Sequence, residues 1–530
     1  MSIDNGNGRL RSSRRRPLAF CYRWAIAVVG SLFFGYAAFR VLFPDTTVGQ
    51  WWDRTVLRGV CAVAALLAVG VLVWWIFRAI DWLPEKRVRW AALCMMLLAG
   101  LLCILSISFF SIAAGWDYGV LLRSALELSR DGALTDMPYF SRYPFQIYPL
   151  LYLTFWMRLI HTQSMSVAYG VSYVLNVAHI LFAVYGAYLF GKYSRGPHFG
   201  LKVLVLCLLS FPLFLYAPIC YTDTLALPFP VWTIVLWLYA RRAPFETRRQ
   251  KIRKVFLYAG SGFMAGLGLR IKSIAAIGLI ALLLFLLFDH TEAGDAESAP
   301  ASRRRAALHK GGVILLLLAG FLIAVTGTGL VAKAAGYGEL HDDRYTYPMT
   351  HWLMMGANRE TVGGYYEADD LFTRSISTYA QRQEQTAERF VERVRTDGYL
   401  PFLLDKLELM LCTGDYQVAG KLAQAPLKRY ALFKNGHSPM VIGYLALEQA
   451  VQSLLLFSLL AGSVFFTRHP DGWRFRLTVM MVIGVLMFLL LWEGKARYLL
   501  FLLPVLNLAA AEGFCCLQRS CRRFRKDKAS

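Results

Sequence analysis

The stretch AALCMMLLAGLLCILSISFFSIAA, residues 91–114, decides what kind of fold this chain can have. It is mostly apolar and contains no charged residue. At 1.5 Å of rise per residue, a helix of this length crosses the roughly 30 Å of hydrocarbon in a bilayer. Hydrocarbon offers no water to the backbone N–H and C=O groups, so such a run must be helical. The stretch therefore predicts a membrane-spanning helix.

Runs of the same kind recur along the whole chain of 530 residues, of which 57% are hydrophobic. Soluble domains are closer to about 45–50% apolar. The predicted fold is an all-α polytopic membrane protein, a bundle of about twelve transmembrane helices. The predicted spans are 19–39, 56–78, 91–114, 166–190, 199–217, 224–240, 255–269, 273–288, 312–335, 441–465, 475–491 and 498–517.

The distribution of positive charge predicts the orientation of these spans. The chain carries 57 Lys and Arg against 34 Asp and Glu, a net charge of +23. Most of the excess lies in alternate connections, as the preference of basic loops for the cytoplasm predicts. No basic patch coincides with a soluble domain, so nucleic acid is excluded as a partner. The segments placed in the cytoplasm are 1–18, 79–90, 191–198, 241–254, 289–311, 466–474 and 518–530.

This topology places both termini in the cytoplasm and two large segments outside. The first external segment, 115–165, contains a helix near 147–163 that we expect to lie at the membrane interface, because counting it as a span inverts every later loop. The second, 337–440, is too long for a simple connector. The predicted parts are a basic N-terminus 1–18, a core 19–336, the external segment 337–440, C-terminal spans 441–517 and a basic tail 518–530.

Charged residues near membrane spans are candidates for function because burying them there is costly. Asp117 follows the third span, and Asp223 lies in a very short outer connection. Lys272 interrupts the apolar pair 255–288, and Lys495 and Arg497 lie between the last two spans. Asp223 is also a suitable helix N-cap, and a lysine at a hairpin tip can simply extend to the headgroups. Cations in so short an outer connection are better explained by an anionic ligand.

These residue types together suit one kind of chemistry. A carboxylate can act as the general base that deprotonates an acceptor hydroxyl. Lysine and arginine can stabilise a phosphate as it gains negative charge. The combination predicts glycosyl transfer from a membrane-embedded lipid phosphate. No spacing of the ten cysteines predicts a zinc site or a disulfide framework.

The order of these motifs resembles the GT-C superfamily of polytopic glycosyltransferases, over about residues 90–517. The resemblance is to protein mannosyltransferases, lipid A aminoarabinose transferases and bacterial mannosyltransferase-like membrane proteins. It is carried by Asp117, by YFSRYPFQ (139–146), by the Thr-Asp pair of YTDTL (221–225), by Lys272 in GLRIK, by HWLMMGAN (351–358) and by Arg497-Tyr498.

The resemblance implies an inverting transfer from a polyprenyl-phosphate sugar to a glycan, glycolipid or protein acceptor on the extracytoplasmic face. It implies Asp117 as the base with Asp223 assisting, and donor-phosphate binding by Arg497, Lys272 and Arg142. Lys495 is added to the donor-phosphate site because of its charge in the short outer connection. Substrate contacts are expected from Tyr139, Tyr143, Gln146, Tyr221, Thr222, His351, Asn358 and Tyr498. Where many family members have two adjacent acidic residues, Asp117 is alone, so a divalent metal is not favoured. A metal shared with Asp223 stays open.

Two alternatives remain at this stage. A flippase or transporter of lipid-linked saccharides would share the helices and the basic sites, although no internal repeat is visible. An oligosaccharide ligase or polymerase would use a pyrophosphate-linked glycan. The identity of the sugar, that of the acceptor and the role of the first two helices are open, and the short loops favour a bacterial plasma membrane.

Overall fold

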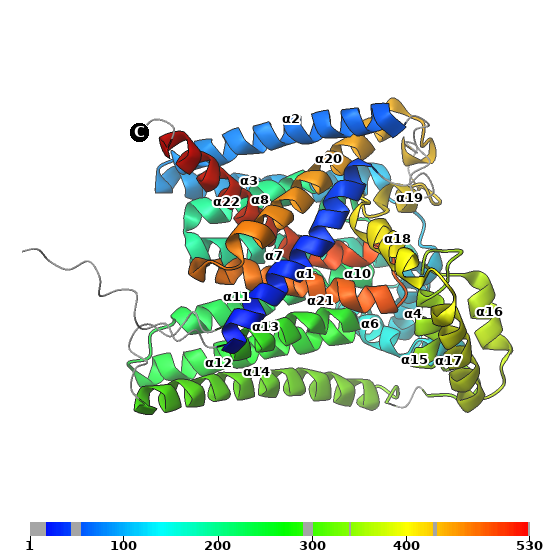
Figure 1. The fold of residues 1–530 in the computed structure, drawn as a ribbon. Helices are drawn as coiled ribbons and strands as arrows, with labels where there is room; N and C mark the ends of the chain where they lie inside the picture. The colour runs from blue at the N-terminus through cyan, green and yellow to red at the C-terminus, as the bar shows by residue number, and fades with distance from the viewer. Residues whose placement is uncertain (1–16, 44–54, 290–299, 339–340, 428–431, 528–530) are drawn as a thin grey trace, which may run out of the picture.

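The computed structural model describes residues 17–43, 55–289, 300–338, 341–427 and 432–527. Within these residues the chain is helical, and an isolated antiparallel bridge between Ile112 and Pro426 is its β pairing. Long helices run side by side in a bundle, and shorter helices gather at one end (Figure 1). The predicted all-helical membrane fold is confirmed.

Nine of the described helices are long and apolar enough to cross a membrane. Three more helices lie in the same bundle: two are shorter apolar helices, and the third begins in a basic segment. The nine are α1 (Pro17–Leu42), α2 (Thr55–Asp81), α3 (Glu85–Phe110), α7 (Met165–Arg195), α10–α11 (Thr222–Leu225, Pro228–Arg242), α14 (Pro300–Ala334), α20 (Pro439–Ala461, extended to Phe466), α21 (Trp473–Leu491) and η7–α22 (Ala496–Leu502, Leu503–Asp527). The three are α8 (Pro197–Leu209), α12 (Arg248–Ile271) and α13 (Ile277–Phe288).

Prolines explain where the helices depart from the predicted spans. The run predicted as one span, 199–217, is instead α8 followed by the single turn α9 (Pro212–Leu215). Pro212 has no backbone N–H to continue α8, so the helix ends at Leu209. In the run predicted as 224–240, Pro228 begins α11 after the short turn α10, as prolines commonly do at a first helical turn.

The interior of the bundle is formed around the last helix. The apolar window of η7–α22 is fully buried, whereas that of α2 is only 11% buried and that of α3 17%. Peripheral helices present large apolar side chains outward, for example Leu67, Trp75 and Leu101. Exposed apolar side chains of this kind suit contact with lipid rather than water.

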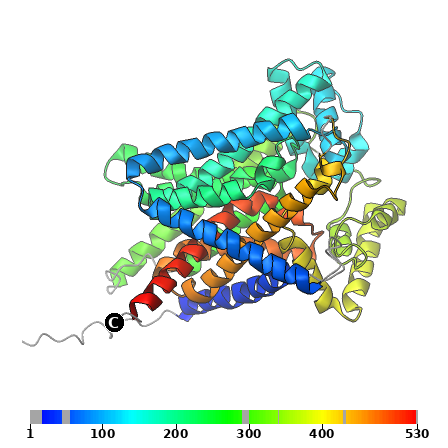
Figure 2. The ribbon, with the colours of Figure 1, turned by 90° about the horizontal axis from the view of Figure 1, so that it is seen from above.

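The two long connecting segments fold at the same end of the bundle (Figures 1 and 2). The first contains α4 (Trp116–Arg130), α5 (Met137–Arg142) and α6 (Ile147–Leu159), the last being the helix predicted near 147–163. The second contains α15 (Met349–Gly356), α16 (Glu367–Ser375), α17 (Tyr379–Arg395), α18 (Tyr399–Leu411) and α19 (Val418–Leu422). The start of the first segment meets the end of the second at the Ile112–Pro426 bridge, where Ala113 N donates to Ala425 O at 2.9 Å.

Buried polar contacts fix the second segment to the bundle. Lys406 on α18 is fully buried, and its ammonium group donates to the carbonyls of Gly356, Leu490 and Trp492 at 2.6, 3.1 and 2.6 Å. Arg40, in the last turn of α1, forms an ion pair with Glu408 on α18. The first helix therefore has a structural role, because it supports the segment that covers this end of the bundle.

Candidate functional site

Asp117 lies in the first turn of α4, immediately after the end of the third predicted span. Its carboxylate accepts hydrogen bonds from the hydroxyls of Tyr139 at 3.1 Å and Tyr221 at 3.2 Å. The Tyr221 hydroxyl in turn accepts from Gln146 Nε2 at 2.7 Å. Burial, reinforced by the Asp117 charge, raises the pKa of Tyr139 well above its usual value, so this hydroxyl stays a donor. The carboxylate is thus held in one orientation with lone pairs remaining for a further partner.

The backbone that presents Asp117 is strained. Trp116 has a φ of 41°, in the left-handed region that a bulky side chain rarely adopts. Gly119 must lack a side chain, since an added Cβ would lie 2.3 Å from Ala114 O. Such conformations persist where the surrounding structure enforces them, and they concentrate at functional sites.

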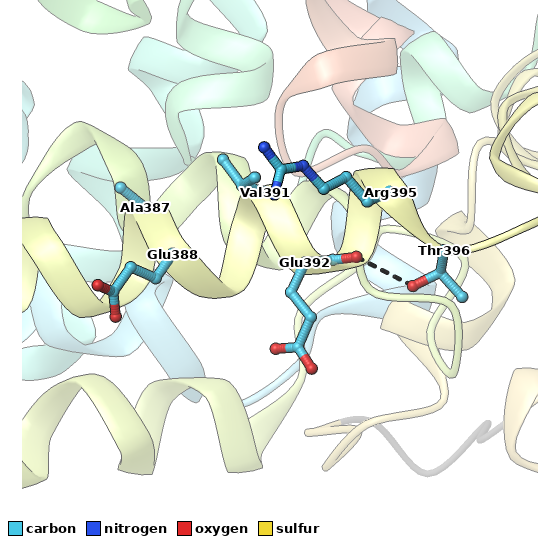
Figure 3. A pocket seen from close by; sticks show the side chains of 6 residues that line it. All are labelled: Ala387, Glu388, Val391, Glu392, Arg395 and Thr396. Atoms are coloured by element: carbon cyan, nitrogen blue, oxygen red, sulfur yellow. Dashed lines mark hydrogen bonds between the residues drawn. The ribbon is translucent and has the colours of Figure 1, made fainter.

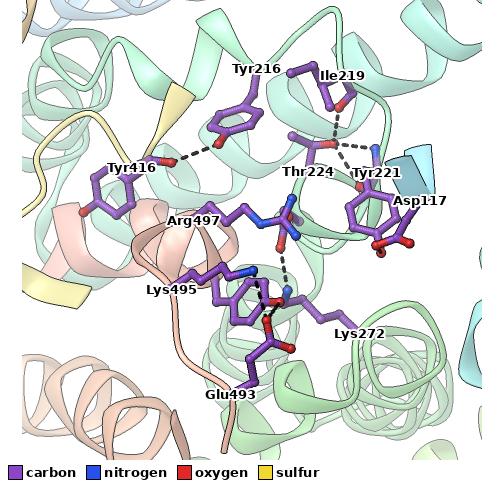
Figure 4. Close-up of polar contacts among 12 residues, drawn as sticks. Asp117, Tyr216, Ile219, Tyr221, Thr224, Lys272, Tyr416, Glu493, Lys495 and Arg497 are labelled. Carbon is purple, nitrogen blue, oxygen red and sulfur yellow. Dashed lines mark hydrogen bonds and ion pairs between the residues drawn. The ribbon is translucent and has the colours of Figure 1, made fainter. Parts of the chain in front are cut away.

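Asp223 and two cations from segments distant in the sequence form the second part of the site. Figure 4 labels both cations, Lys272 and Arg497. Lys272, the residue after α12, places its ammonium nitrogen 2.5 Å from Asp223 Oδ1. Arg497, at the start of η7, has its Nε 3.9 Å from Asp223 Oδ2. The Lys272 ammonium also lies 4.5 Å from the ring centre of Tyr498. The fold thus brings Asp223 together with Lys272 and Arg497.

Arg497 is the most informative side chain of the site. It is only 6% exposed, yet among the described residues its Nε and Nη1 have no hydrogen-bond partner. Its guanidinium carbon lies 5.1 Å from the ring centre of Trp116 and 5.9 Å from that of Tyr221. Buried donors of a charged group are nearly always satisfied, and a planar guanidinium matches the oxygens of phosphate. These donors therefore point to an anionic ligand.

Lys495 has a carboxylate partner. Its ammonium nitrogen is 3.1 Å from Glu493 Oε1, which also accepts from the Tyr498 hydroxyl at 2.8 Å. The ammonium group lies over the ring of Tyr365 at 5.4 Å. Lys495 is therefore neutralised by Glu493 at closer range than Arg497 is by Asp223.

Lys421 belongs to the same cluster, although no sequence motif selects it. It lies on α19, and its ammonium group is 4.2 Å from the ring centre of Trp116. Burial, together with the charges of Arg497 and Lys495, lowers the pKa of Lys421 to about 8. Its sequence neighbourhood, VAGKLAQ, contains no motif, so only the fold reveals this contact.

Residues 19–513 match the family described as conserved hypothetical integral membrane protein. The chain belongs to this family. No curated protein and no solved structure matches it. The matched residues of this integral membrane protein include both parts of the site, from Asp117 to Arg497.

Some residues predicted from the sequence to bind substrate lie outside the cluster around Asp117, Asp223 and Arg497. Arg142 lies over the rings of Tyr143 and Tyr347, at 5.9 and 5.8 Å. Its link to Asp117 is indirect, through the ring of Tyr143, which packs against Tyr139 at 5.0 Å. The contacts of Arg142 are thus those of a residue that supports the aromatic wall beside the base.

His351 and Asn358 have structural partners within the second segment. His351 Nδ1 is 2.7 Å from Thr373 Oγ1, and burial lowers the pKa of His351 to about 4, so its imidazole is neutral. Asn358 Nδ2 donates to Asp369 at 2.9 Å. Asp369 is also bound by Arg393, at 2.7 Å. These contacts hold α15, α16 and α17 together.

Thr222, another residue predicted to contact substrate, is buried beside Asp223 in the turn α10.

Among the described residues, a surface pocket lies on α17, away from the cluster around Arg497. It is lined by Ala387, Glu388, Val391, Glu392, Arg395 and Thr396 (Figure 3). Helix α17 and its C-cap Thr396 supply all of these residues, so no polar groups converge from different elements as they do around Arg497. The described residues include no group of three His, Cys, Asp or Glu side chains placed to hold a metal ion.

The hydroxyl of Tyr221 is expected to be needed for full activity. Tyr221→Phe removes a donor to Asp117 and leaves Gln146 Nε2 without its acceptor. We expect turnover to fall about tenfold or more, since a hydrogen bond to a charged group contributes about 1.5 kcal/mol or more. Steady-state kinetics should show the loss in kcat with little change in KM. Tyr399→Phe is the matched control because that hydroxyl makes no hydrogen bond within the described residues, and equal activity of the two variants would contradict the role of Tyr221.

Proposed function

We propose that this protein is a GT-C-like glycosyltransferase that moves a sugar from a polyprenyl-phosphate donor to an acceptor hydroxyl on the extracytoplasmic face. One observation carries the proposal. Tyr221 links a carboxylate held by two tyrosines, Asp117, to a buried guanidinium, Arg497, which has donors without hydrogen-bond partners among the described residues. A base and a phosphate site side by side are what transfer from a lipid phosphate needs.

The proposed reaction is a single displacement. The acceptor hydroxyl gives its proton to Asp117 while its oxygen bonds to the anomeric carbon of the sugar. The bond between that carbon and the phosphate oxygen breaks, and its electron pair remains on the phosphate. Arg497 and Lys272 stabilise the charge that develops there. Attack from the face opposite the leaving group inverts the anomeric configuration. No metal is part of the proposal.

The proposed topology has twelve spans. The nine long apolar helices, together with α8, α12 and α13, correspond to the twelve runs of the sequence. Both termini are then cytoplasmic, and segments 115–165 and 337–440 are extracytoplasmic. The position of the basic connection 241–254 at the end of the bundle opposite α4 and α15–α19 supports this orientation (Figure 1). A bacterial plasma membrane is the proposed location.

Cysteine labelling tests the orientation. In a cysteine-free background, Met440→Cys at the start of α20 should react with an impermeant maleimide added outside intact cells. Glu246→Cys, an exposed position between α11 and α12, should react only after the membrane is permeabilised. The reverse pattern would contradict the proposed face of the site.

A transfer assay tests the activity. Membranes containing the protein are supplied with a panel of radiolabelled polyprenyl-phosphate sugars, and label is followed into glycan, glycolipid and protein fractions. Transfer from one donor identifies both the sugar and the class of acceptor. Transfer from a pyrophosphate-linked glycan alone would instead indicate a ligase or polymerase.

A further inference from the structure

Lys421 is held in the site by a rigid connection. The turn before α19 contains two residues in the left-handed region, Tyr416 (φ 50°) and Gln417 (φ 61°). The carbonyl of Tyr416 accepts from the Tyr216 hydroxyl at 2.9 Å, and Asp415 accepts from the backbone N–H groups of Gln417 and Ala419. The position of Lys421 over Trp116 is therefore fixed by buried contacts rather than by a flexible loop.

The charges of the cluster leave Lys421 available. Lys272 is paired with Asp223, and Lys495 is paired with Glu493. Within the described residues Lys421 makes no ion pair, and it shares the ring of Trp116 with Arg497. Two cations thus converge on one indole, and one of them, Arg497, has buried donors without hydrogen-bond partners in the part of the chain that the structure describes.

We propose that Lys421 is a phosphate-binding residue which, with Arg497, holds the lipid phosphate of the donor as it departs. This inference rests on the proposed transferase function. It assigns to segment 337–440 a direct part in the site: α19 closes over the phosphate and contributes a cation from outside the bundle.

A charge count supports the assignment. The pairs Lys272–Asp223 and Lys495–Glu493 each sum to zero. Of the remaining groups before transfer, Arg497 and Lys421 contribute two positive charges, and Asp117 and a phosphodiester contribute two negative charges. After transfer, Asp117 has accepted the acceptor's proton and is neutral, while the released phosphomonoester carries two negative charges. The sum is zero in both states. Without Lys421 the site would hold an uncompensated negative charge before and after the reaction, which a partly desolvated site disfavours.

The same geometry makes phosphate binding depend on pH. The groups facing Lys421 are Arg497 and Lys495, which disfavour its protonation, and Asp223 and Asp117, which favour it. Burial is the largest influence, and the pKa of about 8 lies below the ordinary lysine value. Lys421 is cationic below pH 8 and loses its charge as the pH rises through 8. Binding of a lipid phosphate should weaken over that range, and a bound phosphate should raise the pKa.

The experiment uses the purified full-length chain in detergent and measures binding of a long-chain polyprenyl monophosphate between pH 6.5 and 9.5. The corresponding polyprenol is the neutral probe. Lys421→Met should weaken binding of the phosphate about 10- to 100-fold at pH 7 and leave polyprenol binding unchanged. Lys421→Arg should retain the affinity and remove the weakening near pH 8, because arginine stays charged. Lys434→Met, an exposed lysine of the same segment, is the control.

The outcomes separate this inference from the proposed function. Equal phosphate affinity and equal pH dependence in wild type and Lys421→Met would overturn the role of Lys421 alone. A wild type that binds the phosphate no better than the polyprenol would overturn the proposed function as well. Thermal unfolding of each variant verifies folding, and if Lys421→Arg does not fold, the pH dependence of wild type against Lys421→Met decides.

Discussion

Asp117→Asn is expected to lower the rate of sugar transfer about a thousandfold, within the range for loss of a general base. The amide keeps the shape of the side chain and can still accept from Tyr139 or Tyr221, but it cannot take up the acceptor's proton. The loss should appear in kcat, with donor affinity nearly unchanged. The measurement is single-turnover transfer with the purified variant.

Asp131→Asn is the control for this substitution. Asp131 ends the same helix, α4, and forms an exposed ion pair with Arg130 at 2.7 Å. This variant should transfer sugar at the wild-type rate, since an exposed ion pair contributes little. Normal turnover by a well-folded Asp117→Asn protein would show that another group is the base.

Arg497→Ala is expected to have the second largest effect. It removes buried donors that have no partner among the described residues, so a bound phosphate is expected to lose charge-assisted hydrogen bonds worth about 1.5–3 kcal/mol. Donor affinity should fall about 10- to 100-fold. Arg497→Lys should recover only part of this loss, because an ammonium group cannot donate two parallel hydrogen bonds from a planar fork.

Binding measurements on Arg497→Ala need a matched arginine. Arg344 is exposed, and its side chain pairs with Asp342 at 3.1 Å in the second segment. Arg344→Ala should bind the donor as the wild type does. Unchanged donor affinity in Arg497→Ala would place the phosphate elsewhere, while a loss shared by both variants would indicate general destabilisation.

Much of the fold follows from the sequence because a membrane constrains it strongly. An apolar run of about 20 residues has few alternatives to a helix, and basic connections mark one side. That parity placed Asp117, Asp223, Lys272 and Arg497 at the same end of the bundle, although 380 positions separate the first from the last. The local break at Pro212 was missed because the run around it is apolar and long enough to span.

The second segment was less predictable. Its helices α15 to α19 depend on contacts with residues far away in the chain, such as Lys406 with the carbonyl of Trp492. His351 and Asn358 were selected for their motif, yet their contacts are internal to this segment. Lys421 carries no motif, and its importance arises only where α19 meets Trp116. Side chains whose roles depend on such long-range packing cannot be recognised from local patterns.

The most direct test of the central claim is release of polyprenyl phosphate from a polyprenyl-phosphate sugar by the purified protein in proteoliposomes. Donor and acceptor are added together, and the lipid product, the transferred sugar and the leaflet that holds the donor are followed. We expect polyprenyl phosphate and glycosylated acceptor to form in equal amounts with wild type and not with Asp117→Asn. Movement of the intact donor between leaflets, at equal rates in both proteins and without cleavage, would contradict the claim and identify a lipid transporter.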